Sequence, residues 1–408
     1  MNLRLSHLSK LKKTNITISG SKSETNRLLL LQALFPEISI ENISDSDDSV
    51  LMQKALESTE TIIDIHHSGT AMRFLTAYFS IQKNREVILT GSSRMKERPI
   101  GILVEALKIL GATIEYLEKP GFPPLKISGK ELTNNKISIS AEVSSQYISA
   151  LMLIAPKLLN GLEITLEGNI TSRPYIEMTL ALLNQLGIET SFVGNTIKIS
   201  SKPNIHPIKF IVESDWSSAS YYYSIVTLAE VGTEITLSSF KKNSLQADKV
   251  LVDIYKDLGV DTTFENNSIT LKKSRLHTPK NVVLDLTNSP DIAQTITVTC
   301  FGLGISCELN GLHTLKIKET DRLLALKTEL QKMGGKITIT DSSLKQEPNL
   351  QFLDPKIITT YQDHRMAMAF APLALKTNLI IEEAEVVSKS YPNFWEDLKK
   401  LGFRISEI

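Results

Sequence analysis

The sequence has 408 residues, of which 42% are hydrophobic and 22% are charged, and 45 basic residues balance 45 acidic ones. This length accommodates two or three domains, and the composition is too apolar for a disordered chain. A net charge of zero gives no overall field that favours nucleic acid or an anionic membrane, so any binding of anions must come from local groups.

The N-terminal residues MNLRLSHLSKLKK are basic, but no apolar segment of signal-peptide length follows them. No apolar run approaches the roughly 18 residues that a membrane span needs. The two cysteines, Cys300 and Cys307, are too few for a disulfide framework or a four-cysteine zinc site. Together these features predict a cytoplasmic protein without a membrane segment.

Six stretches each combine a small polar or charged cluster with a following apolar run. An apolar run of this kind predicts a helix that is buried on most sides. The free N–H groups and the positive dipole end of each helix would lie at the polar cluster, where they favour bound anions. In chain order the stretches are 19–35, 66–79, 144–156, 214–229, 289–302 and 363–375.

Five amphipathic helices between these stretches are predicted to end at a Leu-Gly or Met-Gly pair. In each, Leu and Ile recur at three- and four-residue spacing, and the glycine would end the helix in the left-handed conformation. Two short β-type runs follow each helix, which indicates a repeat of βαβαββ type. The glycines, 68 to 76 residues apart, are Gly111, Gly187, Gly259, Gly334 and Gly402.

The polar clusters and the glycines together predict six repeats, of which the first is shortened. Only about twenty residues separate Asp48 from Gly69, where the other repeats hold an amphipathic helix and a hairpin. Six repeats divide evenly, so residues 20–213 are predicted to form an N-terminal domain of three repeats. Residues 214–408 form the C-terminal domain, and residues 1–19 are assigned to it because their strand TNITISG completes that half.

Several clusters carry cations that helix capping does not require, among them Lys22, Arg27, Arg73 and Arg365. Further basic clusters stand in GSSRMKERP, IKETDRL and VVSKSYP. The segment 318–322 is predicted to be helical, which would place its lysine, arginine and glutamate side by side. A carboxylate among cations suits general acid and base chemistry.

Two other kinds of site are excluded. The segment Gly20-Ser21-Lys22-Ser23 lacks the upstream glycine of a nucleotide phosphate loop. The seven histidines do not have the spacing of metal ligands, so no metal is predicted.

The motifs GTAMR, RMKERPIG, KETDR and DHRMAM occur in one chain and in this order. With them the sequence resembles the 5-enolpyruvylshikimate-3-phosphate synthase family along nearly its whole length. The resemblance implies a two-domain inside-out α/β barrel with three βαβαββ repeats per domain. It also implies a monomeric transferase that moves the enolpyruvyl group of phosphoenolpyruvate to the 5-hydroxyl of shikimate 3-phosphate. This step of the shikimate pathway to chorismate and aromatic amino acids releases phosphate and needs no cofactor or metal.

The resemblance assigns two sets of binding residues and three catalytic residues. For phosphoenolpyruvate they are Lys22, Gly69, Arg94, Gln146, Arg322, Arg365 and Lys389. For shikimate 3-phosphate they are Lys22, Ser23, Arg27, Ser144, Ser145, Gln146, Ser172, Tyr175, Asp291, Thr314 and Lys318. In this assignment Asp291 takes the proton of the attacking hydroxyl, Glu319 handles the methylene proton and Lys22 stabilises the departing phosphate.

Four positions depart from the family pattern. His67 stands where the family commonly has Asn, and Phe74 stands where Pro often follows the arginine. Both flank the predicted phosphoenolpyruvate pocket and therefore bear on affinity for this substrate and for glyphosate. Thr314 replaces an Asn that touches the shikimate phosphate, and Gln362 replaces the Asn before Asp363.

Two alternatives remain open at this point. The sister enolpyruvyl transferase that acts on UDP-N-acetylglucosamine typically carries a Cys in the loop that corresponds to residues 91–98, which here reads GSSRMKER. A non-catalytic relative that only binds anions is the second alternative. Lys22, Asp291 and Glu319 are all present and favour an enzyme. Nucleic-acid binding is excluded because no basic stripe with interleaved aromatic residues occurs.

Overall fold

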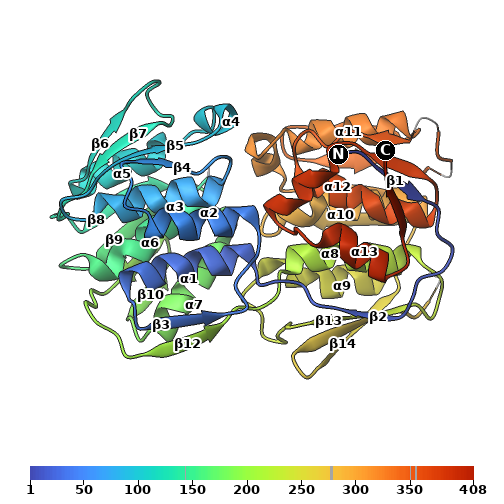
Figure 1. Cartoon of the computed structure of the whole chain (residues 1–408), viewed down its shortest axis with the longest axis horizontal. Helices are drawn as coiled ribbons and strands as arrows, with labels where there is room; N and C mark the ends of the chain where they lie inside the picture. The colour runs from blue at the N-terminus through green and yellow to red at the C-terminus, as the bar shows by residue number, and fades with distance from the viewer. Residues whose placement is uncertain (143, 276–278, 350, 354–355) are drawn as a thin grey trace. The chain divides into compact units, whose positions relative to one another are not determined.

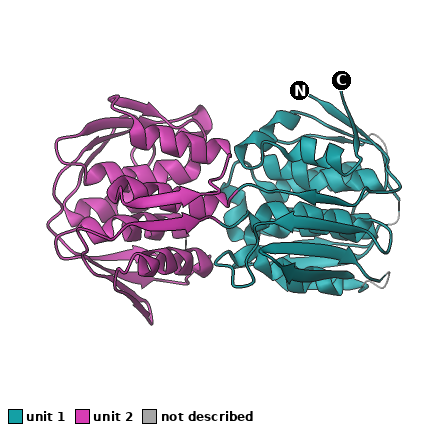
Figure 2. Ribbon diagram, turned by 60° about the horizontal axis from the view of Figure 1, so that its bottom comes forward, with its two compact units in different colours: residues 1–19, 213–408 teal, residues 20–212 magenta. Residues whose placement is uncertain are grey.

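The structure is a computed structural model, and it describes residues 1–142, 144–275, 279–349, 351–353 and 356–408. The chain divides into two compact units, which are coloured separately in Figure 2. Unit 1 comprises Met1–Ser19 and Glu213–Ile408, and unit 2 comprises Gly20–Val212. The sequence-based division, which assigned Glu213 to the other domain, differs from these units by one residue.

Three mutually packed helices form the core of unit 2 (Figure 1). They are α1 (Lys22–Leu34), α3 (Gly69–Ser80) and α6 (Ser145–Ile154). All twelve residues of α3 are buried, as its apolar sequence predicts. Each of three outer helices contacts two of the core helices: α2 (Asp47–Glu57), α5 (Gly101–Leu110) and α7 (Arg173–Gln185).

Strands lie outside the helices of unit 2 in two four-stranded sheets of the same pattern. In each sheet the first two strands are parallel and the others are antiparallel. One sheet, in the order β4-β5-β7-β6, consists of β4 (Ile62–Asp64), β5 (Glu86–Thr90), β7 (Leu125–Ser128) and β6 (Thr113–Tyr116). The other, in the order β8-β9-β11-β10, consists of β8 (Lys136–Ser140), β9 (Leu162–Glu167), β11 (Thr196–Ile199) and β10 (Thr190–Val193).

The first repeat is shorter than the others, as predicted. Its sheet is a parallel pair of β3 (Ile38–Glu41) and β12 (Ile208–Ile211). After α2 the chain continues into β4, which already belongs to the next sheet, so this fully described stretch contains no hairpin. Two short helices complete unit 2: α4 (Ser93–Lys96) and η1 (Ala155–Lys157).

Unit 1 repeats the arrangement with its own three core helices. These are α8 (Trp216–Leu228), α10 (Ala293–Leu303) and α12 (His364–Phe370), which contact one another. The outer helices are α9 (Leu251–Asp257), α11 (Arg322–Lys332) and α13 (Phe394–Lys400). Short helices adjoin the core and outer helices of this unit, and they are η2 (Ala247–Val250), η3 (Pro290–Ile292), η4 (His313–Ile317), η5 (Ala371–Leu375) and η6 (Ala384–Lys389).

Unit 1 has three four-stranded sheets. The first is formed by β14 (Val260–Glu265), β15 (Ser268–Lys273), β13 (Glu234–Ser238) and β2 (Thr14–Ile16). The second is formed by β16 (Asn281–Asp285), β17 (Ser306–Asn310), β19 (Leu344–Gln346) and β18 (Ile337–Ile339). The third is formed by β20 (Ile357–Ile358), β21 (Leu379–Ile381), β1 (Leu3–Ser6) and β22 (Arg404–Glu407). Helices inside and strands outside, in the six repeats that the sequence predicts, are the inside-out α/β barrel that the family resemblance implies.

Two strands, each lying just before the chain passes from one unit to the other, pair with a strand of the unit that the chain is leaving. Strand β2 precedes α1 in the sequence but pairs with β13 of unit 1, and β12 precedes α8 but pairs with β3 of unit 2. Gly20 stands directly after the first crossing. A Cβ atom there would lie 1.9 Å from the Asn42 carbonyl oxygen, so only glycine fits.

The five glycines that were predicted to end helices all have positive φ, between 71° and 110°. The left-handed conformation explains why each amphipathic helix stops at its glycine. Within the described residues, every helix is too short or too polar to span a bilayer.

Candidate active site

One connected set of ion pairs in unit 1 joins six of the predicted site residues to Asp363. We call this set the Arg322 network. Its members come from η3, from the segment before α11, from the first residue of α11, from the start of α12 and from η6, so residues almost 100 positions apart in sequence converge. They are Asp291, Lys318, Glu319, Arg322, Asp363, Arg365 and Lys389.

Arg322 is the centre of this network and is only 2% exposed. Its Nη1 atom lies 2.8 Å from Asp291 Oδ1, and its Nη2 atom lies 2.8 Å from Glu319 Oε2. Its Nε atom lies 2.7 Å from Asp363 Oδ2. Burial alone would lower the pKa of Arg322, but the three carboxylates outweigh it and hold the pKa above its ordinary value.

Asp291 bridges three cations. Besides Arg322, its carboxylate lies 3.4 Å from Lys318 Nζ and 3.5 Å from Arg365 Nη2. Burial opposes the charged form of Asp291, yet the nearby positive charges hold its pKa well below the ordinary value. Burial also lowers the pKa of Lys318, which the charge of Asp291 partly offsets. Asp291 is therefore an ionised carboxylate that can accept a proton once these cations are engaged elsewhere.

Glu319 bridges Arg322 and the fourth cation of the network, Lys389. Its Oε2 atom contacts Arg322, and its Oε1 atom lies 3.1 Å from Lys389 Nζ. The predicted helix over residues 318–322 is wrong, because α11 begins only at Arg322 with Asp321 as its N-cap. The preceding residues form a bend, and Glu319 reaches Arg322 from this bend rather than along a helix face.

Unit 2 surrounds Arg27 with neutral oxygen atoms, which we call the Arg27 shell. The guanidinium donates to Thr179 Oγ1 at 2.8 Å, Ser149 Oγ at 3.0 Å, Ser23 O at 2.7 Å and Tyr175 O at 3.3 Å. The rings of Phe74 and Tyr175 lie 5.5 and 5.8 Å from its Cζ atom. Burial lowers the pKa of Arg27 to about 10, so Arg27 is still cationic at neutral pH.

Lys22, the first residue of α1, lies 3.2 Å from Asp48 Oδ2. Asp48 belongs to the first turn of α2 and is buried. The pair places an ammonium group at the N-terminal end of α1, beside Ser23, whose carbonyl oxygen accepts from Arg27.

The starts of α3 and α6 are joined by a hydrogen bond of 3.2 Å from Gln146 Nε2 to Thr70 Oγ1. Ser144 caps α6 by accepting from the backbone N–H of Gln146, and Ser145 follows it as a buried residue. Gly69 opens α3. A Cβ atom on Gly69 would lie 2.6 Å from Arg98 Nη1, so this glycine leaves space for a guanidinium that the sequence did not assign.

Three predicted site residues make fewer contacts with the others. Arg94 lies on α4 and pairs with Glu97 at 2.9 Å, with 45% of its side chain exposed. Ser172 precedes α7 with a left-handed φ of 52° and is buried. The Thr314 hydroxyl is buried without a hydrogen-bond partner among the described residues.

Sequence reasoning left out the carboxylates that support these cations. Asp48 and Asp363 carried a signal, since the first lies in an acidic run and the second precedes His364-Arg365. No comparable signal in the sequence pointed to Asp248. Its carboxylate accepts a short hydrogen bond from Ser217 in the first turn of α8, and Ser217 Oγ lies 3.3 Å from Arg365 Nη2.

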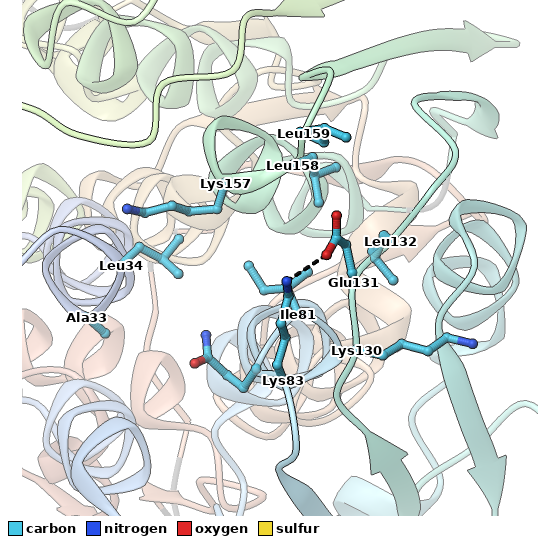
Figure 3. Close-up of a pocket in the computed structure, with 11 residues that line it drawn as sticks. Ala33, Leu34, Ile81, Lys83, Lys130, Glu131, Leu132, Lys157, Leu158 and Leu159 are labelled. Atoms are coloured by element: carbon cyan, nitrogen blue, oxygen red, sulfur yellow. Dashed lines mark hydrogen bonds and ion pairs between the residues drawn. The ribbon is translucent and has the colours of Figure 1, made fainter.

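Figure 3 shows a separate cavity of about 340 Å³ in unit 2, where α1, α3 and η1 end. Its eleven lining residues include four leucines and three lysines, and one of these lysines, Lys83, pairs with Glu131 at 2.6 Å. None of its lining residues belongs to the predicted site. In the part of the chain that the structure describes, no three His, Cys, Asp or Glu side chains gather in a way that could hold a metal ion.

Comparison with known proteins agrees with this geometry. Residues 52–398 match the family model of EPSP synthase (3-phosphoshikimate 1-carboxyvinyltransferase). A 3-phosphoshikimate 1-carboxyvinyltransferase from Bacteroides fragilis is 46% identical over 398 residues, which cover 96% of each chain. Its counterpart from Haemophilus influenzae is 34% identical over 420 residues, covering 95% of this chain and 96% of the relative.

Solved structures show the same fold. An EPSP synthase from Acinetobacter baumannii superposes with a TM-score of 0.81 over 100% of both chains, at 22% identity. The enolpyruvyl transferase NikO from Streptomyces tendae superposes with a TM-score of 0.75 over 99% of this chain and 98% of its own, at 14% identity. The fold, the match to the family model and the identity to relatives lead to one conclusion: the chain belongs to the EPSP synthase (3-phosphoshikimate 1-carboxyvinyltransferase) family of transferases.

Proposed function

We propose that this protein transfers the enolpyruvyl group of phosphoenolpyruvate to the 5-hydroxyl of shikimate 3-phosphate. The observation that carries the proposal is the Arg322 network, in which Asp291 and Glu319 each contact cations that can bind an anionic substrate. A transferase of this kind needs a proton acceptor, a proton donor and cations for carboxylate and phosphate groups. The network supplies all three kinds of group.

In unit 2 we assign shikimate 3-phosphate to Ser23, Arg27, Ser144, Ser145, Ser172 and Tyr175. The direct contacts of Arg27 are neutral oxygen atoms, and the charge of nearby Glu24 only partly offsets the effect of burial on its pKa. A buried cation whose direct contacts are neutral attracts the substrate anion more strongly than one that already has an ion pair. Thr314 and Lys318 of unit 1 provide a hydroxyl and an ammonium for the same substrate.

We assign phosphoenolpyruvate to Lys22, Gly69, Arg94, Gln146, Arg322, Arg365 and Lys389. Arginine binds carboxylate and phosphate through two parallel N–H donors. Arg94 and Lys22 also pair with Glu97 and Asp48, and each keeps further N–H donors for the substrate anion.

The proposed chemistry begins when the substrate anions engage the cations of the Arg322 network. Asp291 then loses part of the positive field that lowers its pKa, and becomes a better base for the hydroxyl proton. The hydroxyl oxygen bonds to C2 of phosphoenolpyruvate while Glu319 delivers a proton to the methylene carbon. In the second half, the bond between C2 and the phosphate oxygen breaks, Lys22 stabilises the charge of the departing phosphate, Glu319 takes back a methyl proton and the vinyl ether forms.

Phosphate release from phosphoenolpyruvate tests the function, with shikimate 3-phosphate and UDP-N-acetylglucosamine as separate acceptors and no added metal. We expect release with shikimate 3-phosphate alone. Release with UDP-N-acetylglucosamine instead would identify the sister transferase. Release with neither, from folded protein that binds shikimate 3-phosphate, would identify a non-catalytic relative.

The roles of single residues are tested by Lys22→Ala, Asp291→Ala and Glu319→Ala. Each should slow turnover by more than about a hundredfold, the usual cost of losing one proton-transfer group. Lys316→Ala is the matched control, because Lys316 pairs with Asp341 outside the Arg322 network. Near-normal turnover in any of the three variants would refute the role of that residue.

We also propose that the protein acts as a monomer in the cytoplasm without a bound cofactor. Light scattering of the purified chain gives the oligomeric state directly. A mass of twice the 45.4 kDa of one chain would contradict the monomer.

A further inference from the structure

Asp248 lies beside the Arg322 network without belonging to it. It sits in η2, is 3% exposed, and accepts through Oδ2 the short hydrogen bond from Ser217. The same Ser217 oxygen accepts from Arg365 Nη2 at 3.3 Å. Because Ser217 has a single hydrogen, donating it to Asp248 turns the oxygen lone pairs toward the guanidinium. Asp248 therefore fixes the direction of the acceptor that Arg365 uses.

The second oxygen atom of Asp248 is buried and has no hydrogen-bond partner among the described residues. A buried carboxylate with one oxygen unsatisfied is costly when it is ionised, whereas a neutral carboxyl group carries its proton there at lower cost. Burial, followed by the charge of Asp291, raises the pKa of Asp248 to about 7. Asp215 raises it further, while the Ser217 hydrogen bond and Arg365 oppose the increase.

The charge balance around Arg365 depends on the state of Asp248. The network contains four cations and three carboxylates, and Asp215 also acts on Arg365 as a fourth negative group. With Asp248 neutral, positive and negative charges balance. Ionised Asp248 adds a fifth negative charge and opposes any anion that approaches Arg365.

We propose that Asp248 is a positioning residue for Arg365, which it orients through Ser217, and that its proton keeps this site receptive to the anion of phosphoenolpyruvate. The inference rests on the proposed function, in which Arg365 binds that substrate. It assigns Asp248 no contact with substrate. The protonation state of a carboxyl group remote from the reacting atoms thereby makes the affinity for phosphoenolpyruvate depend on pH.

The test compares the wild-type chain with Asp248→Asn, which keeps an oxygen acceptor for Ser217 but cannot ionise. KM for phosphoenolpyruvate is measured from pH 6 to 8.5, and Kd for phosphoenolpyruvate without acceptor is measured by calorimetry over the same range. At each pH the wild-type KM or Kd is divided by the value for the variant, because ionisation of the substrate affects both proteins equally and cancels in this ratio. We expect a ratio near one at pH 6 that rises about threefold to tenfold by pH 8.5, as the added negative charge weakens binding.

Ser217→Ala tests the link to Arg365. Removing the hydroxyl should raise KM for phosphoenolpyruvate about tenfold at every pH, the cost of one hydrogen bond to a charged group. Ser217→Thr, which keeps the hydroxyl, should have the wild-type KM for phosphoenolpyruvate. Ser220→Ala is the control on the same helix, since its hydroxyl contacts Ser217 O and Thr295 but not Arg365. Asp253→Asn is the control for an exposed carboxylate beside η2.

Ratios of KM and Kd that stay flat from pH 6 to 8.5 would overturn the inference, as would a Ser217→Ala variant that matches wild type. A purely structural role would lower the stability of Asp248→Asn without changing these ratios with pH. Failure of the proposed function looks different. The wild-type chain would then release no phosphate with shikimate 3-phosphate, while the calorimetric ratio still reports on Asp248.

Discussion

Unit 1 and unit 2 each bury an arginine at the heart of the predicted site, but they surround it differently. Arg322 contacts three carboxylates, whereas the contacts of Arg27 in its shell are hydroxyl and carbonyl oxygens. Carboxylates hold the pKa of Arg322 above its ordinary value, while burial lowers that of Arg27 to about 10. A cation paired with carboxylates has a fixed geometry and a balanced charge, whereas a cation whose direct contacts are neutral attracts an anion more strongly.

Replacing Arg322 tests the comparison most severely. Arg322→Met should lower the free energy of unfolding by about 3–5 kcal/mol, because three buried carboxylates lose their shared cation. Urea denaturation gives this quantity. Lys198→Met, which removes a surface ion pair with Glu163, should cost only a small fraction of that loss. Equal losses in the two variants would show that the Arg322 network contributes no more than a surface pair.

Asp248 sharpens the comparison because it adds a negative charge to unit 1 only at higher pH. Its pKa is raised from 3.8 to about 7, so the stabilising effect of its proton is complete below pH 4 and is lost as the pH rises towards 7. The free energy of unfolding of Asp248→Asn minus that of wild type should therefore increase by about 2–3 kcal/mol when the pH is raised from 5 to 8. Urea unfolding at both values measures this. An unchanged difference would contradict the raised pKa.

Arg27→Met should have a smaller effect than the Arg322 substitution. It leaves hydroxyl and carbonyl groups without a donor, but no buried carboxylate, so we expect a loss of about 1–2 kcal/mol. Binding of shikimate 3-phosphate should weaken at the same time, which calorimetry measures. A loss of stability as large as that of Arg322→Met would remove the distinction between the two surroundings.

Thr179→Val probes one member of the Arg27 shell. The hydroxyl accepts from Arg27 Nε and donates to the Tyr175 carbonyl oxygen or to Ser149, so its removal should cost about 1 kcal/mol. Thr227→Val on α8 removes a hydroxyl that, in the described structure, donates only to the Tyr223 carbonyl oxygen of its own helix, and should change the free energy of unfolding by roughly a few tenths of a kcal/mol. Thermal unfolding followed by circular dichroism resolves the difference, and its absence would make the shell energetically neutral.

The fold could be predicted from the sequence because its signals are local. Polar clusters mark the starts of buried helices, and glycines such as Gly111 and Gly187 mark the ends of outer ones. The sheets that β2 and β12 join are harder to predict from the sequence, because they depend on pairing between strands far apart in the chain. The sequence suggested these pairings only through the strand before Lys22.

The candidate site could be predicted in part. Motifs pointed to Asp291, Glu319 and Arg322, because charged residues in dense clusters stand out and because the family resemblance assigns them. Asp248 and Ser217 lie in ordinary polar surroundings, and only folding brings them to Arg365. The bend before α11 was missed because its residues, KETD, have the spacing of a helix turn while Asp321 acts as a cap.

Strand β1 pairs with both β21 and β22, so that Leu3 stands opposite Glu407. On the ribosome, unit 2 is complete long before these partners exist. At about 5–20 residues per second, β1 waits some tens of seconds for β22 to be synthesised. During that time an apolar strand edge is exposed, with Leu3 and Leu5 not yet covered. Unit 1 is therefore the part of this protein that stays incomplete longest during synthesis, and slower synthesis prolongs the time for which this strand edge is exposed.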